Sequence, residues 1–375
     1  MKYMGSKRWQ LQNGLGRQLR KVVRPGDSFV DLFAGSGSVS WFVATQLDAS
    51  VTAVDLQHYA AALSGAVIER TRRVNADRLV TSWIEPVRSI EISMQGVIEQ
   101  ERRARIGSLS KSAVERIRSI AAGYSQPFVR AYGGHYFSLE QSSQIQRLRD
   151  SLPARKPDAT VCLAALISAA SRCSASPGHT AQPFQPTEKA LPHIQSIWNR
   201  NLLDEVESAL RGIASQHATR AGQALVAEAN SYAETLMGGE VVFVDPPYSA
   251  AQYSRFYHVL EGIAIGGFSA VSGAGRSPAL ADRRRSEFST VSGARTAFAE
   301  LLSILGRKRA RVIVTFPQER ASNGVSGEEV VDLAREWFDV DTVVSSASFS
   351  TLGGNGEGRS ARHRANEMII TMFPK

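Results

Sequence analysis

Cysteine and long apolar runs are scarce in this chain. Its 375 residues include only two cysteines, Cys162 and Cys173, which are too few for a disulfide scaffold and lack metal-ligand spacing. We interpret both as small buried apolar side chains. No apolar stretch approaches the roughly 20 residues of a membrane-spanning helix, and residues 1–5 do not open a signal peptide. These absences predict a cytoplasmic protein with no membrane segment and no metal site.

Charge and composition place the chain among ordinary globular proteins. It has 44 Lys and Arg against 35 Asp and Glu, a formal net charge of +9, with 43% hydrophobic and 21% charged residues. Such values exclude collagen-like, coiled-coil and disordered classes. The positive balance makes a polyanion a reasonable partner without identifying one.

Apolar runs at both ends of the chain predict an α/β sheet. A strand over 28–33, a glycine-rich turn, a helix from 39 and a strand over 51–55 form a βαβ unit, which implies parallel strands. Leu11, Leu15 and Leu19 predict one basic helix before this unit. Later strands are expected over 241–245, 312–316, 340–345 and 367–372, with helices over 294–305 and 328–338.

The middle of the chain has a different pattern. Helical charge spacing over 88–122 and a helix expected over 194–210 predict a mostly helical insertion. We therefore expect one domain from 1–60 and 226–375, interrupted by an insertion at 61–225. The polar stretch 266–293 is expected to form a surface loop.

The first strand leads into a turn with two glycines, Asp31-Leu32-Phe33-Ala34-Gly35-Ser36-Gly37. Glycine lets a ligand approach the backbone closely, and Asp55, at the end of the next strand, can accept hydrogen bonds from both hydroxyls of a ribose. The turn lacks the third glycine of the dinucleotide fingerprint, any Arg or Lys for a pyrophosphate, and a following Gly-Lys-Ser/Thr. A nucleoside without phosphates, such as S-adenosylmethionine, fits better than NAD or ATP. The alternative is that glycine serves packing alone.

A second motif, Asp245-Pro246-Pro247-Tyr248, follows an apolar strand. Proline fixes φ and lacks an N–H, so a stiff loop holds Asp245 at the carboxyl end of the strand, where open α/β sheets bind ligands. The carboxylate and the Pro246 carbonyl can accept the two N–H bonds of a planar amine such as adenine N6 and free its lone pair. Tyr248 offers a face for stacking. The alternative is a proline turn with a surface tyrosine.

Together these motifs resemble the adenine-specific (N6) DNA methyltransferases of the alpha group, the Dam-like class. In that family an N-terminal Gly-x-Lys segment, a Phe-x-Gly-x-Gly turn, a recognition region and Asp-Pro-Pro-Tyr follow in order. The counterparts here are Tyr3-Met4-Gly5-Ser6-Lys7, Phe33 to Gly37, the middle block and Asp245 to Tyr248. The motifs cover both ends of the chain and hardly touch its middle.

The resemblance implies a Rossmann-like methyltransferase sheet, mostly parallel with an antiparallel last strand, and S-adenosylmethionine as methyl donor. It also implies methylation of adenine N6 in duplex DNA, with the base flipped out of the helix. Tyr3, Gly5 and Lys7 would line the methionine end of the donor, and Phe33, Gly35 and Gly37 would pass beneath it. The rest of the expected donor site is Asp31, Ala34, Asp55 and Asp245, with Asn230 in place of the acidic residue that the family often has near the donor's adenine.

Candidates for contact with DNA lie outside these motifs. Tyr253, Arg255 and Tyr257 can wall a base pocket or touch the strand, although an amphipathic helix with core aromatics explains Phe256 and Tyr257 as well. The others are Arg172 and His179 in a loop-like segment, and Arg359 and Arg362 in a glycine-rich basic segment between two strands.

Three alternative functions stay open at this point. A cytosine-N4 methyltransferase uses the same amine chemistry but more often has Ser in place of Asp245. An RNA amine methyltransferase can carry a similar tetrapeptide, and a non-catalytic DNA-binding subunit can retain the fold. The sequence predicts neither the recognition site nor a separately encoded partner such as a restriction endonuclease or defence-system subunit.

Overall fold

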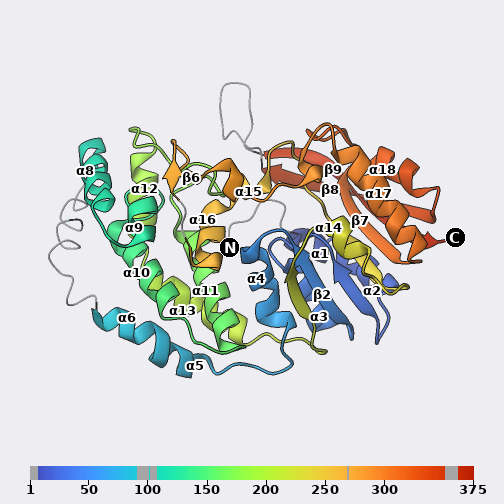
Figure 1. Cartoon of the computed structure of the whole chain (residues 1–375), viewed down its shortest axis with the longest axis horizontal. Coiled ribbons are helices and arrows are strands. Elements are labelled where there is room, and N and C mark those ends of the chain that lie inside the picture. Colours follow the sequence, from blue (N-terminus) through green and yellow to red (C-terminus); the bar gives the residue numbers. More distant parts are fainter. Residues whose placement is uncertain (1–6, 91–100, 102–107, 268–269, 351–361) are drawn as a thin grey trace. The chain divides into compact units, whose positions relative to one another are not determined.

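The computed structural model describes residues 7–90, 101, 108–267, 270–350 and 362–375 (Figure 1). The chain forms two compact units, each built from separate segments. Among the described residues, the sheet unit comprises those up to Arg72, those within Gln216–Ser254 and those within Arg284–Lys375, and the helical unit comprises those within Arg73–Ser215 and Arg255–Arg283. The helical unit thus takes in residues 255–283, which the sequence analysis assigned to the other domain.

A seven-stranded sheet forms the centre of the sheet unit, in the order β3-β2-β1-β4-β7-β9-β8. The first five strands in this order pair in parallel, whereas β9 pairs antiparallel with both β7 and β8. The predicted Rossmann-like α/β sheet with an antiparallel last strand is therefore confirmed. The strands are β1 (Ser28–Asp31), β2 (Ser50–Asp55), β3 (Gln223–Val226), β4 (Val241–Val244), β7 (Arg311–Pro317), β8 (Phe338–Ser350) and β9 (Arg362–Pro374).

Alternating side chains on the strands build two apolar layers. Phe29 and Phe243 point into one core with α2 (Leu15–Val22) and α3 (Ser38–Gln46). Val30 and Val242, their neighbours in sequence, belong to a second core. The helices of that second core are α14 (Ala229–Ala233), α17 (Ala294–Arg307) and α18 (Gly327–Ala334). Helices on both faces explain why β4 is apolar throughout and why its neighbours β1 and β7 carry consecutive apolar residues.

The amino-terminal helix differs from its prediction. Gly14, at φ 134°, separates α1 (Arg8–Gln12) from α2, so the leucine spacing runs across two helices. The next helix after β2, α4 (His58–Ile68), also belongs to the sheet unit. Because of the break at Gly14, α1 is a helix separate from α2. Lys7 is the residue immediately before the first turn of α1.

The helical unit packs around apolar residues such as Val114, Ile117 and Trp198. Cys162 and Cys173 are both buried on α11, as predicted. The α-helices described in the helical unit are α5 (Ala76–Leu79), α6 (Glu85–Ile90), α8 (Lys111–Ala122), α9 (Pro127–Tyr132), α10 (Leu139–Asp150), α11 (Asp158–Cys173), α12 (Leu191–Trp198), α13 (Leu202–Ala214) and α16 (His258–Ile265). A π-helical turn joins α5 to α6 over Val80–Ile84, and α15 (Tyr253–Phe256) precedes α16. A short hairpin, β5 (Val271–Ser272) with β6 (Ser277–Pro278), lies in the expected loop.

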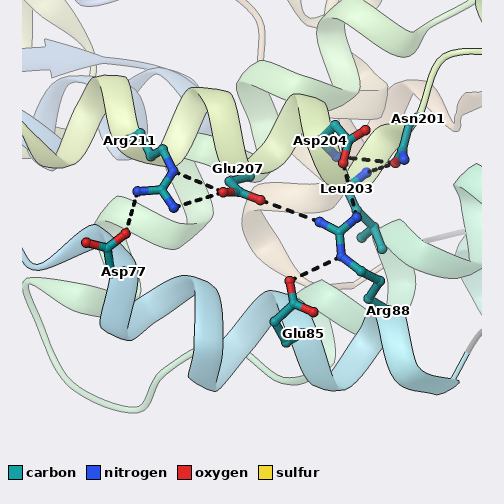
Figure 2. A network of polar contacts seen from close by, with 8 residues as sticks. All are labelled: Asp77, Glu85, Arg88, Asn201, Leu203, Asp204, Glu207 and Arg211. Carbon is teal, nitrogen blue, oxygen red and sulfur yellow. Dashed lines mark hydrogen bonds and ion pairs between the residues drawn. The ribbon is translucent and has the colours of Figure 1, made fainter.

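Two arginines tie α13 to the α5–α6 segment (Figure 2). Arg88 lies 3.1 Å from Asp204 and 3.5 Å from Glu207, and Arg211 lies 2.6 Å from Asp77 and 2.9 Å from Glu207. Glu207 therefore accepts from both arginines. Solvent weakens each pair, but the shared carboxylate makes them a network rather than isolated contacts.

The described ranges contain neither a candidate membrane-spanning helix nor a candidate metal site. None of their helices is long and apolar enough to cross a bilayer. Nor do they contain a group of three or more His, Cys, Asp or Glu side chains placed to hold a metal ion.

Candidate active site

The glycine turn and the tetrapeptide meet where the strand order reverses. The chain runs outward from β1 through β2 to β3, and then returns to place β4 on the other side of β1. Asp31 pairs with Phe243, and the Leu32 N–H donates to the Phe243 carbonyl at 3.1 Å. Parallel strands put both carboxyl ends at one edge, and ligands of open α/β sheets bind at this switch point. The topology thus assigns both motifs to one candidate site.

Asp55 fastens the glycine turn to the end of β2. Its Oδ2 accepts the Gly35 N–H at 2.8 Å, and its Oδ1 accepts the Gln57 N–H at 2.9 Å. Gly35 has φ 51°, a left-handed conformation in which glycine is unstrained. A carboxylate has about four acceptor positions, so these two bonds are compatible with further bonds to a ribose. A carboxylate at this position, beside a turn without Lys or Arg, fits the ribose of a nucleoside without phosphates.

Gly37 has a packing role in addition to the donor contact that the sequence predicts. It has φ 74°, and a Cβ there would lie 3.0 Å from the Ser64 Oγ and 3.2 Å from the Trp41 Nε1. The space beside Gly37 is filled by the protein itself, which packs α4 against the turn. The role of Gly37 beneath a donor stays a prediction, whereas its packing role is visible in the fold.

Asp31 is a buried residue of the turn. It is 1% exposed, and the Ser40 Oγ donates to its Oδ2 at 2.6 Å. Burial raises the pKa of Asp31 to about 7, and the charge of Asp245 adds to this effect while Ser40 opposes it. This geometry gives Asp31 a place under the turn, and its predicted contact with the donor remains untested.

The side chains of Asn323 and Phe316 contact the Asp-Pro-Pro-Tyr loop. The Asn323 amide donates to the Pro247 carbonyl at 3.1 Å and to the Phe288 carbonyl at 3.0 Å. The Tyr248 ring meets Phe316 edge-on, with centroids 6.5 Å apart and an interplanar angle of 88°. Phe288 also contacts Phe33 of the glycine turn at 5.0 Å, so packing links the two motifs.

Asp245 lies in a buried cluster of charges. The Lys7 Nζ lies 2.9 Å from its Oδ1 and 2.5 Å from the Oε1 of Glu367 on β9. The Thr315 hydroxyl donates to the same Oδ1 at 2.9 Å, and Gln10 donates to the other oxygen of Glu367. The sequence analysis found neither Glu367 nor Thr315. Lys7, expected at the donor, directs its ammonium to the catalytic candidate.

Burial and charge set the protonation of this cluster. Burial raises the pKa of Asp245 to about 6, Lys7 and Thr315 oppose this rise, and Glu367 reinforces it. Burial alone lowers the pKa of Lys7, but the two carboxylates outweigh it and raise the pKa above its ordinary value. Asp245 is therefore ionised at neutral pH and loses its charge in mild acid.

Asn230 turns towards α17. Its Nδ2 donates to a Glu300 carboxylate oxygen at 2.8 Å and to the Ala297 carbonyl at 3.2 Å. Its Oδ1 is buried with no hydrogen-bond partner in the described part of the chain. Glu228 lies nearer the carboxyl end of β3, where it accepts the Ser231 N–H at 2.8 Å and caps α14. The sequence analysis did not single out this acid, and Asn230 as donor ligand remains a prediction.

The residues predicted to contact DNA differ in their burial and in their side-chain contacts. Tyr257 is buried at 1% exposure, and Arg172 pairs with the Glu205 carboxylate and donates to its carbonyl at 2.7 Å. These contacts are those of residues that support the helical unit. His179 stacks edge-on against Phe256 at 5.1 Å, whereas Arg255 is exposed.

Tyr253 belongs to the sheet unit, and burial raises its pKa, with Tyr248 and Asp245 adding to the rise. The remaining candidates cannot be placed. Tyr3, Gly5 and Arg359 lie outside the described residues, and Arg362 lies on β9 with its side chain undescribed.

Comparison with known proteins gave one relative of interest. No protein-family model matches the chain. The chain is 24% identical over 380 residues to a protein named Modification methylase LlaI, from Lactococcus lactis subsp. lactis. The alignment covers all of this chain and 55% of that protein, so the chain spans about half the length of this curated relative. The similarity therefore extends through the middle block, which the motifs did not cover.

Proposed function

We propose that this chain transfers a methyl group from S-adenosylmethionine to the N6 amine of adenine in duplex DNA. The observation that carries the proposal is the position of Asp245. Its carboxylate, followed by the rigid Pro246-Pro247 pair, lies at the carboxyl end of β4, beside the glycine turn at the switch point of the sheet. The similarity to a modification methylase supports DNA as the substrate class.

The donor would bind along the carboxyl ends of β1 and β2. Gly35 would let it approach the backbone, Asp55 would accept its ribose hydroxyls, and Phe33 would form part of the apolar surface beneath it. S-adenosylmethionine, when bound, supplies an electrophilic methyl group on a positively charged sulfur. No Lys or Arg lies in the turn, so the site suits a ligand without phosphates.

The target amine would meet oxygen acceptors that are already in place. Lys7 and Thr315 contact Asp245 through Oδ1, which leaves Oδ2 for an N–H of the substrate. The Pro246 carbonyl would accept the second N–H, and Tyr248 would stack on the base. Opening a base pair costs a few kcal/mol, which stacking and these hydrogen bonds offset. Acceptors fixed before reaction stabilise the positive charge that develops on the attacking nitrogen.

The test is methyl transfer by the purified full chain. Labelled S-adenosylmethionine and duplex DNA should give N6-methyladenine on nucleoside analysis, and Asp245→Ala should abolish transfer while donor binding survives. Asp27→Asn removes a carboxylate that pairs with Arg311 at 2.7 Å, remote from the motifs, and serves as the matched control.

Three results would contradict the proposal in different ways. N4-methylcytosine as product would correct the target base, and preference for structured RNA over duplex DNA would correct the substrate. Failure to bind the donor would identify a non-catalytic protein.

A further inference from the structure

The contacts of Asp245 continue through Lys7 to a second carboxylate. Lys7 is 4% exposed and Glu367 is 1% exposed, and the ammonium lies between carboxylate oxygens at 2.9 and 2.5 Å. Gln10, also buried, donates to the Glu367 oxygen that Lys7 does not approach most closely. Glu367 therefore uses both of its oxygens inside the sheet unit.

Neutralising Asp245 would require only Lys7. Burying a second carboxylate costs free energy that one shared ammonium does not fully recover. Two carboxylates and one ammonium leave one negative charge in the cluster. That excess charge lies beside the oxygen that would meet the substrate amine, where positive charge develops during the proposed reaction.

We propose that Glu367 is a positioning residue for methyl transfer: it shares the Lys7 ammonium with Asp245 and so keeps Asp245 a net acceptor for the substrate amine. The inference rests on the proposed function and extends it to β9. Without Glu367, Lys7 would form a neutral pair with Asp245. The pair would attract the amine less and would hold the carboxylate in a different orientation.

The pH dependence of the reaction distinguishes this role from support of the fold. The groups that act on the Asp245 charge are Lys7, Glu367, Asp31 and Tyr253, together with the Thr315 hydroxyl. The negative charge of Glu367 raises the pKa of Asp245. Removing that charge should therefore move the acid limb of the rate profile to lower pH, whereas a merely structural loss would leave the limb in place.

The experiment measures kcat of Glu367→Gln, in the full chain with saturating donor and duplex DNA, from about pH 5 to about pH 9. Plateau kcat should fall about 10- to 100-fold, as for a misplaced reacting group, with donor affinity retained. The acid limb should move down by about one pH unit. Asp27→Asn, which breaks a partly buried ion pair elsewhere in the same unit, should change neither quantity.

Lys7→Met tests whether Glu367 acts through the ammonium. In that background, Glu367→Gln should lower kcat no further. If Glu367→Gln does not fold, Gln10→Met loosens Glu367 without removing a charge. It should then lower kcat when Lys7 is present but not in the Lys7→Met background, whereas a merely structural loss would lower kcat in both.

Several outcomes overturn the inference. They are an unmoved acid limb in Glu367→Gln, whether or not kcat falls, an undiminished effect in the Lys7→Met background, or, where Gln10→Met replaces an unfolded Glu367→Gln, a kcat that is unchanged or that falls equally with and without Lys7. A wild-type chain that binds donor but methylates no DNA overturns the proposed function and this inference together. An active wild type with an unaffected Glu367→Gln overturns the inference alone.

Discussion

Gly37→Ala should lower the free energy of unfolding for two separate reasons. The first is backbone strain, because φ 74° is left-handed and costs an L-residue about 1–2 kcal/mol. The second is overlap, because the new Cβ would lie 3.0 Å from the Ser64 Oγ, and overpacking of this kind costs about 1–3 kcal/mol. The free energy of unfolding should therefore fall by about 2–5 kcal/mol.

Ser64→Ala provides the matched background. The Ser64 Oγ is buried and has no hydrogen-bond partner among the described residues, so its removal alone should cost little. In that background Gly37→Ala loses the overlap with the Ser64 Oγ and keeps the backbone cost of about 1–2 kcal/mol, together with the approach of the new Cβ to the Trp41 Nε1 at 3.2 Å. The difference between the two costs measures the overlap with the Ser64 Oγ.

Urea unfolding of the four chains measures the effect. An unchanged slope m across the series permits comparison of the midpoints. An equal cost of Gly37→Ala with and without Ser64 would show that the overlap with α4 contributes nothing. No cost in either background would refute the packing role of Gly37 altogether.

Three further predictions concern the site and the helical unit. Tyr248→Ala should lower kcat more than Tyr248→Phe, because stacking needs the ring and not the hydroxyl; the reverse order, measured by methyl transfer, would contradict this. Thr315→Val should move the acid limb of kcat to higher pH, since the Thr315 hydrogen bond lowers the pKa of Asp245; a limb that moves down would reject the assigned bond. Burial, with Arg283 adding to it, lowers the pKa of His258 to about 4 from an ordinary 6.5, so the neutral ring favours the folded state above pH 6.5. Stability should fall by about 3 kcal/mol as pH drops from 6.5 through 4, and His258→Asn should flatten this slope in thermal melts; an equally steep slope in the variant would exclude His258 as its source.

The motifs that the sequence revealed are local ones. Each motif begins at the carboxyl end of a strand: Asp31 to Gly37 at the end of β1, and Asp245 to Tyr248 after β4. The position of each motif at that edge of the sheet therefore follows from the local sequence, without knowledge of any tertiary contact. The switch point then follows from the strand order. The apolar runs of β1, β4 and β7 were similarly readable because helices cover both of their faces.

The features that the sequence concealed depend on distant partners. Glu367 is a polar residue at the start of an apolar run, and nothing nearby indicates that it meets Lys7. β3 has only four residues, Gln223–Val226, of which Gln223 is exposed and the others are partly buried. So short a strand gives no clear alternation, and the sequence analysis therefore includes most of it in the insertion. The leucine spacing crosses Gly14 unbroken, and only the backbone reveals that two helices share it. Asn230 faces α17 because of packing that sequence order does not encode.

The contact between Lys7 and Glu367 joins positions 360 residues apart. During translation the amino-terminal strands leave the ribosome long before β9, and folding of emerged segments begins during synthesis. The nascent Lys7 ammonium therefore meets Asp245 without its second carboxylate until residue 367 has emerged. Products that terminate before residue 367 contain both motifs but lack β9, the strand between β7 and β8, and the second carboxylate. The proposed role of Glu367 therefore predicts that such products do not position Asp245 for methyl transfer.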